Sequence, residues 1–201
     1  MSPSPDWRRT RKTFRHGHLA EALVAAALKR LETDGVEALS LRELARDAGV
    51  NHRAVYRHFP DKLSLTARVA EHGWQRLSRR IRSQMKGKPS GEQALIAGGV
   101  GFFLFAREHP NLFHLMAGPR VNLDGAFPTL ETAMGATLVM LERAFIDAGT
   151  APGVVRLRTA LFTAALQGVT TQILHRRLHV SAREAKSFIA DACKMLFKGL
   201  R

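Results

Sequence analysis

This sequence has few cysteines and no long uncharged apolar stretch. Among 201 residues there is one cysteine, Cys193, which excludes an internal disulfide and favours a reducing compartment. The longest uncharged apolar stretch, residues 94–106, is shorter than the ~20 residues that a membrane-spanning helix needs. Acidic residues are also few: 17 Asp and Glu stand against 31 Lys and Arg, a formal net charge of +14. This excess favours a polyanionic partner, nucleic acid before a membrane surface or an acidic substrate.

Signals for catalysis and for export are missing as well. The sequence contains no glycine-rich phosphate loop, no nucleophile elbow and no paired carboxylates in one segment. Cys193 falls in a predicted buried helix, where a thiol is a poor nucleophile. Arg8 and Arg9 precede an apolar stretch at 19–31, as in a twin-arginine export signal, but that stretch contains three charged residues. We therefore expect a cytoplasmic protein that is not an enzyme and uses no cofactor.

A metal site is also not expected. His175 and His179 are spaced i, i+4 in a predicted helix, a spacing that can hold a metal ion. However, no Cys, Asp or Glu stands near them, and Arg176 and Arg177 lie between them.

Apolar residues recur at helical spacing along almost the whole chain, and no run alternates with the period of a strand over more than a few residues. The pattern predicts an all-α chain of about nine helices. Three capping boxes support helix starts: Ser40 with Glu43, Ser90 with Gln93, and Ser181 with Glu184. The predicted helices span residues 19–34, 41–48, 51–58, a long stretch after Pro60, 91–109, 110–117, a stretch ending before Gly149, 152–178, and a last helix after Ser181.

Three segments follow from this pattern. Residues 1–15 form a basic arm without apolar periodicity. Residues 16–62 form a domain of three helices, and residues 63–201 form a helical bundle. The arm is equally compatible with insertion into a minor groove and with a passive solvated tail, and removal of residues 2–13 distinguishes the two by the salt dependence of DNA binding.

Two short helices joined at a glycine in residues 40–59 indicate a helix-turn-helix motif. Gly49 supplies the turn, Ala45 lets the helices approach, and apolar residues such as Leu44 and Val55 form the small core between them. The second helix then directs polar and basic side chains outward, toward base edges or phosphates in a major groove: His52, Arg53, Tyr56 and Arg57. Ser40 and Lys62 flank the motif at positions that suit phosphate oxygens.

From Leu19 to Ala70 the sequence resembles the N-terminal domain of TetR/AcrR-type transcriptional regulators. The features that carry the resemblance are Asp34-Gly35, the segment 40–45 (SLRELA), Gly49-Val50 and the segment 56–62 (YRHFPDK). The chain length, the order of elements and the apolar C-terminal helices also match. The resemblance implies a TetR-like fold, in which an N-terminal helix-turn-helix domain joins a C-terminal bundle.

The resemblance also implies a function. Regulators of this family bind double-stranded operators with approximate two-fold symmetry as homodimers, and many release DNA when a small apolar or amphipathic inducer binds. The positions that match the family's usual DNA contacts are Ser40, Arg42, His52, Arg53, Tyr56, Arg57, His58 and Lys62. His58 is equally compatible with a structural role beneath the helix. The His52-Arg53 pair departs from the common pattern, so no operator sequence is transferred to this chain.

The bundle contains many large apolar residues, most of which are expected to be core. We expect some of them to line an inducer cavity: Phe102, Phe103, Phe105, Phe113, Met116, Met134 and Phe162. Gly98, Gly99 and Gly101 leave room beside them or permit close helix packing.

The last two helices are apolar on wide faces, which indicates either pairing with a second copy or burial within one chain. For pairing, the expected interface residues are Leu161, Ala165, Val169, Ile173, Phe188, Ala192 and Leu196. The sequence thus predicts a sequence-specific, ligand-responsive repressor. Two alternatives stay open: an architectural protein that binds DNA by charge alone, and a small-molecule binder with a vestigial helix-turn-helix.

Overall fold

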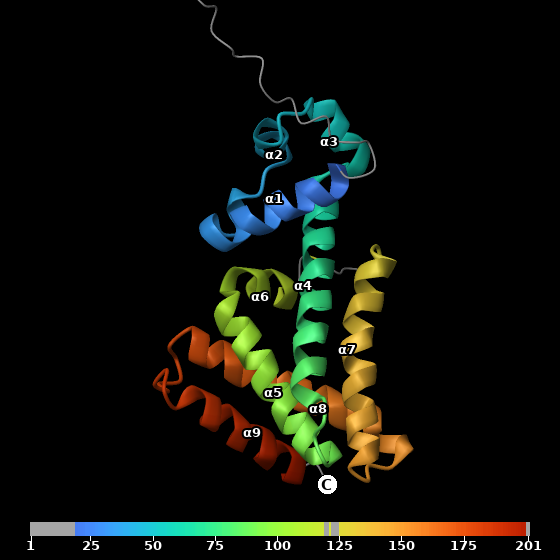
Figure 1. Cartoon of the computed structure of the whole chain (residues 1–201), viewed down its shortest axis with the longest axis vertical. Coiled ribbons are helices and arrows are strands. Elements are labelled where there is room, and N and C mark those ends of the chain that lie inside the picture. The colour runs from blue at the N-terminus through green and yellow to red at the C-terminus, as the bar shows by residue number, and fades with distance from the viewer. Residues whose placement is uncertain (1–18, 119–120, 122–124, 200–201) are drawn as a thin grey trace, which may run out of the picture. The chain divides into compact units, whose positions relative to one another are not determined.

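The computed structural model describes residues 19–118, 121 and 125–199. These residues form nine α-helices and one short 3-10 helix, and no strand occurs among them (Figure 1). The predicted all-α fold is therefore confirmed. The basic arm at residues 1–15 lies outside the described residues. None of the helices described here is long and apolar enough to cross a membrane.

The chain divides into two compact units between Val69 and Ala70. The division falls inside the long helix α4, whereas the sequence placed the boundary between residues 62 and 63. The first unit contains α1 (Leu19–Asp34), η1 (Val36–Ala38), α2 (Leu41–Asp47), α3 (His52–His58) and the start of α4 (Lys62–Met85). The second contains the rest of α4 with α5 (Gly91–Glu108), α6 (Pro110–Ala117), α7 (Pro128–Asp147), α8 (Pro152–Leu174) and α9 (Ala185–Gly199).

The first unit is built around a small core shared by its helices. Helix α1 contributes a stripe at i, i+4 and i+8 that is fully buried, formed by Leu23, Ala27 and Leu31. Helices α2 and α3 add Leu44 and Val55, also fully buried. The chain passes between α2 and α3 at Gly49, whose φ of +64° is a conformation that side chains disfavour. The glycine at this turn is thus a backbone requirement, as predicted.

The second unit packs around α5, which contacts α6, α7, α8 and α9. The largest side chains in its core are Phe103, Phe145 and Phe162, all essentially inaccessible to solvent. Phe145 meets Phe162 edge to face at 5.6 Å and stacks on Phe197 of α9 at 6.0 Å between ring centroids. These aromatic contacts tie α7, α8 and α9 together.

Two helix boundaries differ from the sequence prediction. Helix α8 ends at Leu174 rather than near Leu178, and Arg176 then adopts a left-handed φ of +57°. His175 and His179 are therefore not on one helix face, which removes the geometry considered for a metal site. Among the described residues, no group of His, Cys, Asp and Glu is arranged to hold a metal ion. Helix α9 begins at Ala185, after a turn in which the Ser181 hydroxyl accepts from the Glu184 amide at 3.3 Å.

The α5–α9 contact predicts a specific sensitivity at Gly99. A Cβ built at this position would lie 2.3 Å from Cys193 Sγ, which is far inside van der Waals contact. We expect Gly99→Ala to destabilise the protein by about 1–3 kcal/mol, because the new Cβ and the buried Cys193 Sγ cannot both keep these positions. Thermal unfolding measures this loss.

A control and a rescue sharpen the test. Gly135 of α7 has no atom within 4 Å of its built Cβ, so Gly135→Ala should be neutral or stabilising. Adding Cys193→Ala to Gly99→Ala should restore most of the lost stability. An unchanged melting temperature for Gly99→Ala alone would show that the two helices are not in this close contact.

Candidate nucleic-acid interface and apolar cavity

Helix α3 has one buried side and one exposed side. Asn51 caps its start by accepting a hydrogen bond from the Arg53 amide at 2.9 Å. Val55 points into the core and has no exposed surface. The polar and basic side chains of the helix are exposed: His52, Arg53, Tyr56, Arg57 and His58. The exposed side of α3 is thus free to meet a partner, and His58 does not pack beneath the helix.

The acidic side chains of α2, Glu43 and Asp47, are paired with a basic residue of α1. Arg30 of α1 forms ion pairs with Glu43 at 2.5 Å and Asp47 at 2.7 Å. The hydrogen bond to Asp47, together with the charges of both carboxylates, raises the pKa of Arg30 above its ordinary value. Among the described residues, Arg42, Arg53 and Arg57 have no carboxylate partner. The motif therefore presents uncompensated positive charge, as a nucleic-acid surface requires.

The Ser40–Glu43 capping box is not formed, which corrects the sequence prediction. Ser40 is the N-cap of α2, but its side chain makes no capping hydrogen bond. Glu43, the expected partner, pairs with Arg30 instead. The Ser40 hydroxyl is half-buried at the helix start and keeps its hydrogen-bonding capacity for an external group.

Lys62 stands at the first position of α4 and is exposed. Its Nζ donates to the Glu37 carbonyl at 3.3 Å, which holds the ammonium near η1, the short helix that precedes α2. Asp61 caps the same helix by accepting a hydrogen bond from the Ser64 amide at 2.7 Å. The eight predicted DNA contacts thus lie on α2, on α3 and at the two flanking helix starts.

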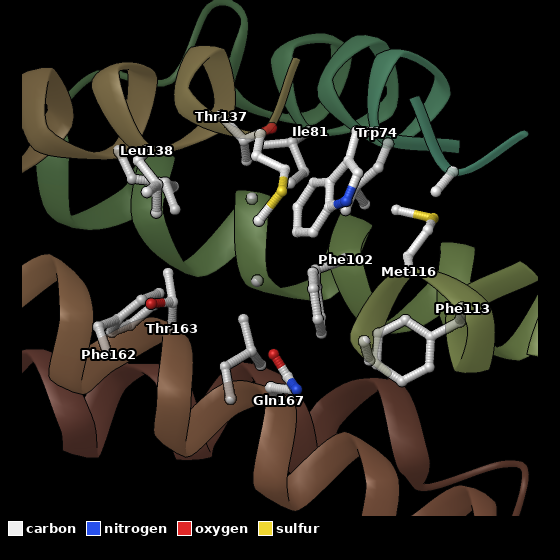
Figure 2. Close-up of a pocket in the computed structure, with 18 of the residues that line it drawn as sticks. Trp74, Ile81, Phe102, Phe113, Met116, Thr137, Leu138, Phe162, Thr163 and Gln167 are labelled. Atoms are coloured by element: carbon white, nitrogen blue, oxygen red, sulfur yellow. The ribbon is translucent and has the colours of Figure 1, made fainter. Parts of the chain in front are cut away.

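The second unit encloses a cavity of about 380 Å³, within the usual size range of small-molecule sites. Its walls come from α4, α5, α6, α7 and α8, and most of the lining side chains are apolar or aromatic (Figure 2). Leu138 of α7 and Gln167 of α8 both line the cavity and are exposed, so it opens to solvent beside them.

Five of the seven side chains proposed from the sequence line this cavity, namely Phe102, Phe113, Met116, Met134 and Phe162. Phe103 and Phe105 do not line it. Phe103 lies on another face of α5, with the Arg107 guanidinium 5.7 Å from its ring centroid. Phe105 is buried beside the His109 ring, 5.1 Å away.

Sequence reasoning missed the wall that α4 provides. Ala70, Trp74, Leu77 and Ile81 line the cavity from one side of that helix. Their spacing of i, i+4, i+7 and i+11 is the signal that identifies a single helix face. The polar lining residues Thr137, Thr163 and Gln167 carry no such periodic signal. Gly98 and Gly99 line the cavity and also permit close helix packing.

Helices α8 and α9 each have a buried face and an exposed apolar face. On α8 the buried stripe includes Phe162 and Leu166, whereas Leu157 and Leu161 on the other side are 63% and 47% exposed. On α9, Met195 is 74% exposed and Phe188 is 39% exposed. Of the seven residues proposed for pairing, Leu161 and Phe188 are exposed, and the others are half-buried: Ala165, Val169, Ile173, Ala192 and Leu196. None of the seven is fully buried within its own chain.

Comparison with known proteins agrees with this geometry. Residues 23–69 match the family "Bacterial regulatory proteins, tetR family". An uncharacterized HTH-type transcriptional regulator of Haemophilus influenzae is 31% identical over 109 residues, which cover 54% of this chain and 53% of that protein. The chain therefore spans about half the length of this curated relative.

Solved structures extend the similarity to nearly the whole chain. A protein of unknown function from a Rhodococcus species has a TM-score of 0.79 and 27% identity, with 94% of this chain and 98% of that chain covered. A TetR variant from Acinetobacter baumannii, solved in complex with minocycline, has a TM-score of 0.64 and 19% identity over 88% and 93% of the two chains. Residues 23–69, which contain the helix-turn-helix motif, therefore form a domain of the tetR family of bacterial regulatory proteins.

Proposed function

We propose that this protein is a sequence-specific DNA-binding transcriptional regulator that acts in the cytoplasm and has no catalytic activity. The observation that carries the proposal is the exposed face of α3, where Arg53 and Arg57 have no acidic partner among the described residues and lie beside Tyr56. Such a helix fits the major groove, where side chains near its N-terminus reach base edges. The uncompensated charge attracts phosphates and lowers the free energy of binding.

Within this proposal, the contacts divide into two kinds. Arg53 lies in the first turn of α3, and its guanidinium is suited to the two acceptors of a guanine. Ser40 and Lys62 lie at helix starts on either side of the motif and bind phosphate oxygens, which sets the position of α3 without reading sequence. Arg42, His52, Tyr56, Arg57 and His58 complete the proposed contact set.

The regulator acts as a homodimer on an operator with two-fold symmetry. The exposed apolar faces of α8 and α9 support this step, because they include Leu157, Leu161, Phe188 and Met195. Pairing two copies through these helices buries them in a four-helix arrangement. Two recognition helices then meet half-sites whose centres are about 34 Å apart, or a multiple of that distance.

The cavity in the second unit supports regulation by a small apolar or amphipathic inducer, and we propose a repressor that releases its operator when the inducer binds. The ligand shifts the equilibrium only by its differential affinity for the two states of the dimer. Minocycline in the similar Acinetobacter structure shows that one relative with this fold takes a small molecule.

Selection of bound sequences from random double-stranded DNA tests this function. The proposal predicts an enriched motif with two inverted half-sites. Two other outcomes contradict it. Binding without enrichment supports an architectural protein that recognises charge alone, and absence of DNA binding at low salt supports a small-molecule binder with a vestigial helix-turn-helix.

A further inference from the structure

The cavity described above has no charged side chain among its described lining residues. Glu71 of α4 is a buried carboxylate, but it does not line the cavity. It accepts hydrogen bonds from Gln75 at 3.0 Å and from Thr129 at 2.8 Å. An ion that entered the cavity would lose its water without gaining a partner of opposite charge there. The lining therefore favours an uncharged occupant. Arg120 and Asp124 lie outside the described residues.

Four polar side chains line the cavity, and two of them already have a hydrogen-bond partner within the chain. The Thr163 hydroxyl donates to the Thr159 carbonyl at 2.8 Å, and the Thr137 hydroxyl is hydrogen-bonded to Ser78. Trp74 and Gln167 have no hydrogen-bond partner in the described part of the chain. The indole Nε1–H of Trp74 can only donate, whereas the Gln167 amide can both donate and accept.

These two open groups enter from different walls. Figure 2 shows the indole of Trp74 from α4 and the amide of Gln167 from α8, with the ring of Phe102 between them. Phe102 also meets Phe113 edge to face, with ring centroids 5.5 Å apart at 85°. A flat ring placed against these aromatic walls gains more contact than a flexible chain of the same size.

We infer that the cavity binds an uncharged, largely apolar molecule with an aromatic ring, whose carbonyl or ether oxygen accepts a hydrogen bond from Trp74 Nε1. A second polar group of such a molecule lies at the mouth, where Gln167 is exposed to solvent. The regulatory meaning of this binding rests on the proposed function, but the binding itself does not. Carboxylates and ammonium ions of equal size bind more weakly, because the described lining residues offer them no partner of opposite charge.

Three probes of nearly equal size and different charge test the inference: 4-phenyl-2-butanone, 3-phenylpropanoate and 3-phenylpropylammonium. Trp74 reports binding directly, because the only other tryptophan, Trp7, is removed by Trp7→Phe. We expect the ketone to change the Trp74 emission and to bind at least ~10-fold tighter than either ion. Equal affinity for the carboxylate or the ammonium ion, or no response to the ketone up to its solubility limit, overturns the inference.

The role of Trp74 is tested by calorimetry with Trp74→Phe, which keeps an aromatic ring but removes the donor. We expect the affinity for the ketone to fall about 3- to 10-fold, the usual effect of one neutral hydrogen bond. Butylbenzene, which has no acceptor, should bind the two proteins equally. Equal losses for both probes would mean that Trp74 contributes only shape, which contradicts the assigned hydrogen bond.

These results are separable from those for DNA binding. Ketone binding by a protein that selects no DNA sequence would refute the proposed function and leave the ligand class standing. Sequence-specific DNA binding without ketone binding would refute the ligand class alone. In both cases, a cooperative thermal unfolding transition verifies that the protein is folded.

Discussion

Replacing both Leu157 and Leu161 with glutamate is expected to convert the proposed dimer to a monomer and to weaken operator binding by about 10²–10⁴-fold. Both side chains are exposed in the single chain, at 63% and 47%, so charge here does not disturb the core. In a dimer through α8 and α9, four carboxylates would be buried together without partners. A monomer then binds each half-site separately and loses the effective concentration that linkage provides.

Sedimentation equilibrium and titration of operator DNA measure the two effects. Val139→Glu is the matched control, because Val139 is an apolar residue of α7 that is 65% exposed. The control should remain a dimer with little change in DNA affinity. A dimeric mass for the double variant would show that the copies pair through another surface.

Arg53→Ala is expected to weaken operator binding by about 10²-fold or more and to relax specificity at one base pair in each half-site. A bidentate contact between arginine and guanine contributes roughly 1–3 kcal/mol of discrimination, and a homodimer makes the contact twice. The substitution leaves the fold intact because Arg53 is exposed and its amide, not its side chain, bonds to Asn51. Selection from random DNA with the variant identifies the relaxed position.

Arg46→Ala is the charge-matched control for this experiment. Arg46 is an exposed residue near the end of α2, 4.0 Å from Asp47 and outside the proposed contact set. The Arg46→Ala substitution should lower the affinity for DNA slightly and by the same factor for all sequences. If Arg53→Ala behaves in the same way, Arg53 contacts phosphate rather than base.

The fold was largely predictable from the sequence, because local chemistry determines where the helices begin and end. Gly49 ends α2 with a positive φ, Asn51 caps α3, and Pro110 and Pro152 occupy first turns of α6 and α8. Each of these effects depends on residues close in sequence. They are therefore visible in the sequence without knowledge of tertiary contacts.

The errors arise where distant residues compete with local ones. Ser40 and Glu43 have the spacing of a capping box, but the Glu43 carboxylate instead pairs with Arg30 of α1, 13 positions away in the sequence. Similarly, the apolar residues of α5 do not reveal which of them face the cavity. Phe102 lines it and Phe103 does not, because adjacent residues of a helix point about 100° apart.

The candidate DNA-binding residues were proposed from a short motif, whereas the cavity required the tertiary structure. Exposed positions of α3 follow from the burial of one residue, Val55, and the helical period. The cavity is formed by five helices that are far apart in sequence, and Trp74 joins it from a helix that begins in the other unit. No local pattern encodes that arrangement.

The most direct test of the account compares DNA carrying a selected symmetric site with scrambled DNA of equal length and composition, across a series of salt concentrations. We predict an affinity for the symmetric site at least ~10³-fold higher than for scrambled DNA at physiological salt, with one dimer bound to each site. Equal affinity for both DNAs, falling steeply together as salt rises, would contradict sequence-specific recognition by α3.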